Sequence, residues 1–220
     1  MSGYSDNYIH RLLSSRTNPT NSSVRQVDVD QLRVSAHVVR SNFEDMNSWV
    51  DSDDMSQSAL IIENSNTEGE KRVLKLLAML HNYLSSLYSF NEQLVETVAN
   101  YADIGSVKED GIISLPDEST GYTRKLAFVR GLRHQIQHGD FRCLDVDTVD
   151  EVSEFSIKQI KFVEELFRQG CVDEPDKYLR TSSAEEREYP IPYIAEFHKK
   201  DFNQLASDCV EWLEKGTSKR

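Results

Sequence analysis

Long apolar runs are missing from this sequence of 220 residues. No stretch approaches the roughly 18 consecutive apolar residues that a membrane-spanning helix needs. Residues 1–20 also lack the apolar segment of a secretory signal. We therefore expect no membrane partner.

Cysteine is scarce, and the three residues lie far apart at Cys143, Cys171 and Cys209. Their number is odd and none of them forms a C-x-x-C pair, so a disulfide framework is not indicated. Reduced thiols in a cytoplasmic protein are the simplest interpretation.

Positive charge is in short supply, with 25 Lys and Arg residues against 37 Asp and Glu residues and a formal net charge of −12. A field of this sign repels phosphate, which argues against a general nucleic-acid binder. Any nucleic-acid function needs a local positive patch. The P-loop, the dinucleotide-binding glycine motif and the G-x-S-x-G nucleophile motif are also absent from the sequence.

What the sequence does contain is helical periodicity, which predicts an all-α protein built as a bundle of four to five helices. Apolar residues recur at helical spacing over residues 28–50, 67–102, 123–138, 148–169 and 198–214. Residues 171–197 contain three prolines and are expected to be irregular, with a turn of helix after Ser182. The predicted organisation is a flexible polar tail over residues 1–27, one helical domain over 28–215, and a free tail over 216–220.

Local signals mark several of the expected helix ends. Thr67–Glu70 and Thr148–Glu151 have the spacing of capping boxes, which favour helix starts. Gly139 follows the helix predicted at 123–138, where a glycine typically ends a helix.

One segment stands out against the acidic background. Residues 121–144 contain five basic residues and one acidic residue, together with two of the six histidines. On a helical wheel, Arg133 lies at the edge of the buried arc, with Arg130 and Gln137 beside it. His134 and His138 are neighbours at i, i+4 further round the helix. This arrangement predicts an anion-binding surface.

The residues Arg133-His134-Gln135-Ile136-Gln137-His138 resemble the signature of the HEPN superfamily, an Arg, a polar residue, a few further residues and a His. The resemblance covers about residues 67–168. It implies an all-α core that often dimerises along the helix that carries the motif. Many members are metal-independent endoribonucleases of toxin–antitoxin or antiviral defence systems, and others are non-catalytic binding modules.

If the resemblance holds, it implies a role for each motif residue and requires no cofactor. Arg133 would hold the scissile phosphate, and His138 would be the general base or acid that completes the catalytic pair. His134 would be the polar partner of the motif. Arg130 and Gln137 would line the site. RNA would be the substrate, and a homodimer or a partner protein is a further expectation.

Geometry leaves an alternative open for these residues. Arg133 and His138 are i, i+5 on a helix, about 140° apart, so they converge only if the helix ends or if two copies combine. Otherwise Arg133 would pair with a carboxylate, and His138 would cap a helix end. His81 and Asn91 would line the opposite side of the site, or would be ordinary polar residues within the bundle.

Two other functions compete with the ribonuclease hypothesis. The first is a non-catalytic helical module that binds a protein or nucleic acid through the same face. The second is a metal hydrolase that uses His134 and His138, with Asp140 or His198 as a third ligand. In zinc proteases with this spacing a Glu follows the first His, whereas Gln135 stands there in this sequence.

Overall fold

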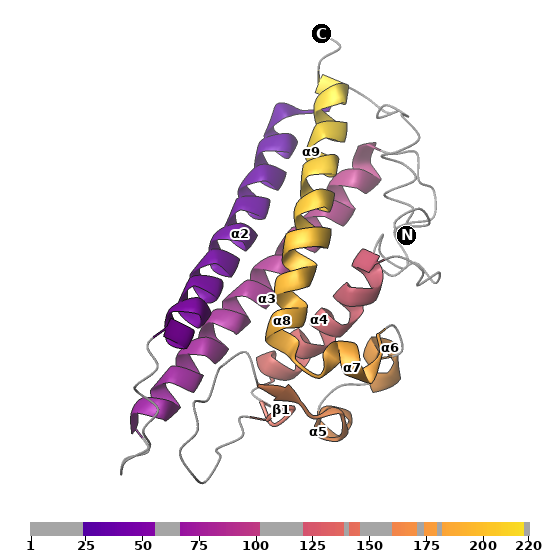
Figure 1. Ribbon diagram of the computed structural model, residues 1–220. Coiled ribbons are helices and arrows are strands. Elements are labelled where there is room, and N and C mark those ends of the chain that lie inside the picture. The colour runs from indigo at the N-terminus through magenta and orange to yellow at the C-terminus, as the bar shows by residue number, and fades with distance from the viewer. Residues whose placement is uncertain are drawn as a thin grey trace.

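The computed structural model describes residues 24–55, 67–101, 121–138, 141–145, 160–170, 174–179 and 182–217. This part of the chain is almost entirely helical, which confirms the all-α prediction (Figure 1). No helix within it is both long and apolar enough to cross a membrane.

Four longer helices form the body of the molecule, and shorter elements connect them. The longer helices are α2 (Gln26–Met55), α3 (Thr67–Tyr101), α4 (Gly121–Gln137) and α9 (Asn203–Thr217). The shorter elements are β1 (Leu144–Asp145), β2 (Lys161–Phe162), α5 (Glu164–Gln169), α6 (Pro175–Leu179), α7 (Ala184–Arg187), α8 (Pro190–Glu196) and the π-helix η2 (Phe197–Phe202).

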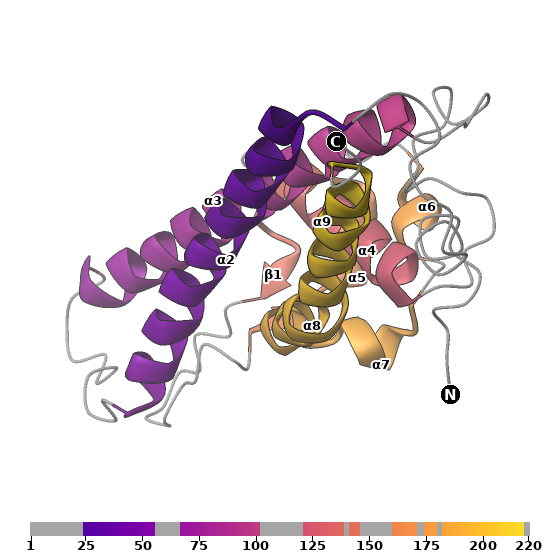
Figure 2. The same ribbon diagram turned by 90° about the horizontal axis from the view of Figure 1, so that it is seen from above.

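Helices α2 and α3 lie antiparallel along each other (Figures 1 and 2). At one end, the backbone N–H of Arg25 donates to the hydroxyl oxygen of Tyr101 at 3.3 Å. At the other end, the ammonium of Lys75 lies 5.8 Å from the centroid of the Trp49 ring. Contacts at both ends fix the register of these two helices.

Helix α9 also runs antiparallel to α2. Nε of Arg40 donates to Oδ1 of Asn203 at 2.8 Å near the start of α9. Near the end of α9, Glu214 forms an ion pair with Arg33 of α2. The core of the described structure includes large side chains that are almost completely buried, among them Tyr83, Phe90, Phe128, Phe167, Phe197 and Phe202.

The helix predicted over residues 148–169 is correct for the last six residues of its described part and wrong for those before them. Residues 161–162 form strand β2, which pairs antiparallel with β1, and only Glu164–Gln169 are helical. The ring of Phe162 packs edge-on against Phe128 and Phe167. These partners from elsewhere in the sequence hold the strand in place, and the spacing of apolar residues within 148–169 does not reveal them. The capping box at Thr148–Glu151 lies outside the described residues.

The segment 171–197 is more regular than predicted, because three short helices occupy much of it. Pro175 and Pro190 are the first residues of α6 and α8, positions where the fixed φ of proline suits a helix start. The helix predicted from residue 198 begins as the wide turn of η2 and continues as α9.

The domain begins a few residues earlier than expected. Val24 is buried, and α2 starts at Gln26. At the other end, α9 extends to Thr217, into the segment expected to be a free tail. The remainder of both expected tails, residues 1–23 and 218–220, lies outside the described residues.

Candidate functional site

Helix α4 carries the motif, and two of its residues fix it against the short helices. A Cβ atom at Gly131 would lie 2.7 Å from Cζ of Phe167 and 2.9 Å from Cβ of Tyr178, so α4 approaches α5 and α6 very closely. Gln135 is completely buried and donates from Nε2 to the carbonyl oxygen of Phe167 at 2.8 Å. The rotation of α4 about its axis is thereby set.

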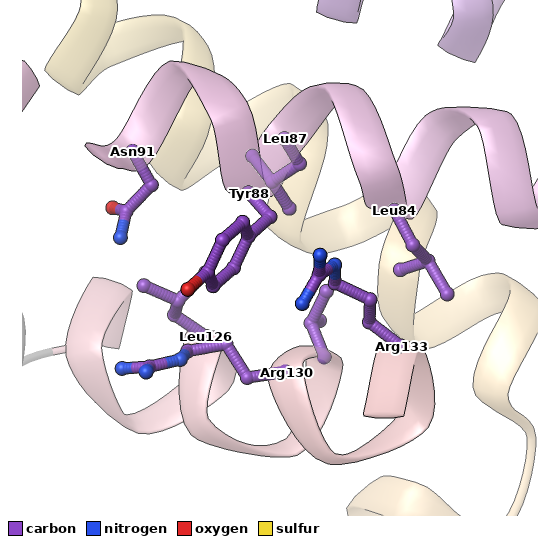
Figure 3. Close-up of a pocket in the computed structure, with 8 residues that line it drawn as sticks. Leu84, Leu87, Tyr88, Asn91, Leu126, Arg130 and Arg133 are labelled. Atoms are coloured by element: carbon purple, nitrogen blue, oxygen red, sulfur yellow. The ribbon is translucent and has the colours of Figure 1, made fainter. Parts of the chain in front are cut away.

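With that rotation, another face of α4 meets α3 at a small surface depression (Figure 3). The residues that line it come in comparable numbers from the two helices: Leu84, Leu87, Tyr88, Asn91, Leu126, Val129, Arg130 and Arg133. Its empty space, which includes open solvent, is about 210 Å³, so the depression is a shallow part of the surface.

Arg133 lies at one side of the depression, against an aromatic ring of α3. Its guanidinium carbon is 3.7 Å from the centroid of the Tyr88 ring, a close cation–π contact. Its Nε is buried and has no hydrogen-bond partner in the part of the chain that the structure describes. Burial lowers the pKa of Arg133, and nearby Arg130 lowers it further, against the opposing influence of Tyr88 and Glu92. The group stays charged, since arginine titrates far above neutral pH.

Tyr88 descends from α3 between Arg130 and Arg133 (Figure 3). A hydrogen bond with Glu92 raises the pKa of the Tyr88 hydroxyl, and partial burial raises it too. The phenol is therefore neutral at physiological pH.

The arginines of this depression differ from most others in the described structure. Arg25, Arg33, Arg168 and Arg187 each form an ion pair with a carboxylate. Within the described residues, neither Arg130 nor Arg133 has such a partner. In a chain with an excess of acidic residues, two adjacent unpaired guanidinium groups are an anion-binding feature.

One basic residue of the segment 121–144 already has acidic partners. The ammonium of Lys125 lies 3.1 Å from Glu196 and 3.3 Å from Asp201, so its charge is balanced by acidic residues of α8 and η2. Arg130 and Arg133 are the charged residues that line the depression.

The two motif histidines lie together further round α4. The ring centroids of His134 and His138 are 4.6 Å apart, with the rings tilted by 55°. His134 is partly buried and His138 is exposed just beyond the last residue of α4. The backbone N–H of His138 donates to the carbonyl oxygens of His134 and Gln135.

The structure brings some of the predicted site residues together and separates others. Arg130 and Arg133 of α4 and Asn91 of α3 line the depression. His81 is a partly buried residue of α3 and does not line it. The motif residues Gln137, His134 and His138 lie toward the exposed end of α4, outside its lining.

Sequence reasoning did not single out Tyr88 as a site residue. The residue is only partly buried, and its ring holds the guanidinium of Arg133. The helical spacing of Tyr88 suggested an inward side chain, but the spacing contains no information on which residue of α4 lies opposite.

His198, one of the two residues proposed as a third metal ligand, lies in the hydrophobic core. His198 is buried and stacked on Phe43, with ring centroids 3.9 Å apart, and its Nδ1 is 3.3 Å from the hydroxyl of Tyr83. Across the described ranges, no three His, Cys, Asp or Glu side chains are grouped so as to hold a metal ion. Asp140 lies outside those ranges.

Comparison of the chain with protein-family models, with curated proteins and with solved structures finds no match. The site itself is therefore the basis for a functional proposal.

Proposed function

We propose that this protein is a HEPN-like endoribonuclease that cleaves RNA without a metal, as part of a toxin–antitoxin or defence system. The observation that carries this proposal is the pair of guanidinium groups, Arg130 and Arg133, at an open depression with no carboxylate partner among the described residues. The imidazoles of His134 and His138 follow on the same helix. Cations that hold a phosphate and an imidazole that moves a proton are sufficient for this reaction.

Each group has a defined task in the proposed reaction. The ribose 2′ oxygen forms a bond to phosphorus while the bond from phosphorus to the 5′ oxygen breaks. The proton lost by the 2′ hydroxyl passes through His138 to the leaving 5′ oxygen. Arg133 stabilises the negative charge that builds up on the phosphoryl oxygens, and the products are a 2′,3′-cyclic phosphate and a 5′ hydroxyl.

The chemistry of the depression supports a phosphate ligand. Its floor is apolar and its charged groups are the two arginines, so it favours a compact anion. Tyr88 holds the guanidinium of Arg133 in place before substrate arrives, which reduces the entropy lost on binding. The nearby carboxylate of Glu92, which acts on the charge of Arg133, opposes an anion.

Pairing of two copies along α4 completes the proposed site. His138 lies beyond the end of α4 and outside the lining of the depression. The HEPN resemblance implies a dimer along the motif helix, in which His138 of one copy reaches the phosphate held by Arg133 of the other.

The proposal is tested with purified wild-type protein, Arg133→Gln and His138→Asn on mixed-sequence single-stranded RNA in the presence of EDTA. Loss of a proton-transfer group typically costs about 10²–10⁴-fold in rate, and we expect His138→Asn to fall by that amount. Arg168→Gln and His37→Asn are matched controls that should keep the wild-type rate, because Arg168 already pairs with Glu164 and His37 is an exposed residue of α2. Circular dichroism must show that all five proteins are helical. Equal cleavage by all of them contradicts the proposal.

A non-catalytic RNA-binding module is the second candidate, and the separation of His138 from the depression favours it. Fluorescence anisotropy with the same RNA distinguishes the two functions. The enzyme predicts that His138→Asn binds RNA but does not cut it, whereas the module predicts binding without cleavage by every protein except Arg133→Gln.

A further inference from the structure

We propose that His134 and His138 form a two-imidazole chelate for a transition-metal ion such as Zn²⁺, and that the bound ion inhibits RNA cleavage. The inhibition, though not the chelate, rests on the function proposed above. The two residues are i, i+4 on α4, the spacing that places two side chains on one helix face.

The geometry of the pair suits a shared ion. The ring centroids are 4.6 Å apart, and ring nitrogens bind Zn²⁺ at about 2.0–2.1 Å. The χ2 angle of histidine is broad and roughly two-fold, so the rings can turn toward one ion without moving the backbone. The backbone is already held at this point, because the N–H of His138 donates to the carbonyl oxygens of His134 and Gln135.

Both histidines of the pair are reached by solvent. His138 is exposed and His134 is partly exposed, so solvent reaches the rings. Two protein ligands leave the remaining positions of a four-coordinate ion to water. Imidazole nitrogen favours Zn²⁺, Cu²⁺ and Ni²⁺ over Mg²⁺ and Ca²⁺, which prefer oxygen.

Occupancy of the chelate would remove the proton carrier of the proposed reaction. An imidazole nitrogen bound to a metal has its lone pair engaged and cannot accept a proton. The ion would thus act as an inhibitor, and EDTA should leave cleavage unchanged or faster. This outcome is the opposite of that for a metal hydrolase, which loses activity in EDTA.

The chelate is tested by isothermal titration of the full chain with ZnCl₂ and NiCl₂. We expect one ion per chain and affinity lowered by about 100-fold in either His134→Asn or His138→Asn, since the second ligand acts at high effective concentration. The control His37→Asn should match the wild type, and MgCl₂ should give no binding. A second readout is thermal unfolding, in which Zn²⁺ should raise the melting temperature of the wild type and the control only.

Two results would overturn the inference. Equal Zn²⁺ affinity in the wild type and both single variants would show that the two histidines do not chelate. If saturating Zn²⁺ binds at the pair and RNA cleavage is unchanged, the bound ion is not an inhibitor. If the wild type cleaves no RNA at all, the proposed function fails, and the titration still decides whether the chelate exists.

Discussion

His198 shows how a single polar side chain can belong to the core. Its ring stacks on Phe43 and Phe202 and lies within 3.3 Å of the Tyr83 hydroxyl. Burial lowers the pKa of His198 to about 3, and the positive charges of Arg40 and Lys199 lower it further. The residue is therefore neutral in the folded protein under ordinary conditions.

Because His198 is buried in its neutral form, we expect the folded protein to lose stability in acid. An exposed histidine has a pKa of about 6.5, so between pH 6.5 and 3 the unfolded chain binds a proton here that the folded chain does not. The free energy of unfolding should therefore fall as pH is lowered through this window, by up to about 1.4 kcal/mol per pH unit. Urea unfolding at several pH values measures the slope.

The variant His198→Phe isolates that contribution. It retains the stacking on Phe43 but loses the hydrogen bond with Tyr83, so stability at pH 7 should drop by about 1 kcal/mol. The slope between pH 6.5 and 3 should become shallower. An unchanged slope would contradict the assignment of His198 as a buried neutral group.

At the scale of elements, the long helices could be predicted, and the short connections could not. Helices α2, α3 and α4 follow from apolar spacing and from the lack of proline within them, and they agree with the prediction to within a few residues. The strand at Lys161–Phe162 forms because β1 pairs with it and because Phe128 packs on Phe162. Both partners are distant in sequence, so periodicity within residues 148–169 could not reveal the strand.

Because α4 packs closely against α5 and α6, we expect the substitution Gly131→Ala to have an unusual effect on stability. Glycine to alanine within a helix normally stabilises by about 1 kcal/mol. At Gly131 the new Cβ would collide with Phe167 and Tyr178, so we expect Gly131→Ala to destabilise by about 1–3 kcal/mol. Thermal and urea unfolding measure the change.

Gly216 in the last turn of α9 is a matched control. Gly216→Ala should be neutral or slightly stabilising, because helix propensity dominates there. If both substitutions stabilise the protein, the close approach of α4 to α5 and α6 is wrong.

At the scale of the whole molecule, charge limits how the protein meets RNA. The net charge of −12 repels a polyanion, and Lys125 is already balanced by Glu196 and Asp201. The sequence indicated where the positive patch lies, because Arg130 and Arg133 are close in the chain. It could not indicate that Lys125 is paired or that Tyr88 supports Arg133, since those contacts join distant residues.

Few phosphate contacts predict a weak dependence of RNA affinity on salt. If Arg130 and Arg133 supply two contacts, the slope of log K against log salt should be about −1.4 for single-stranded RNA. Anisotropy titrations at several salt concentrations measure it. A slope several times steeper would indicate a larger basic surface than the depression between α3 and α4.

The most direct test of the central claim compares two substrates in EDTA. One is an all-ribose RNA, and the other has the same sequence with every 2′ hydroxyl methylated. Our account predicts that the wild type cuts only the first, leaving 2′,3′-cyclic phosphate ends, and that His138→Asn cuts neither. Cleavage of both substrates by the wild type, or equal cleavage of the first by His138→Asn, would contradict the account.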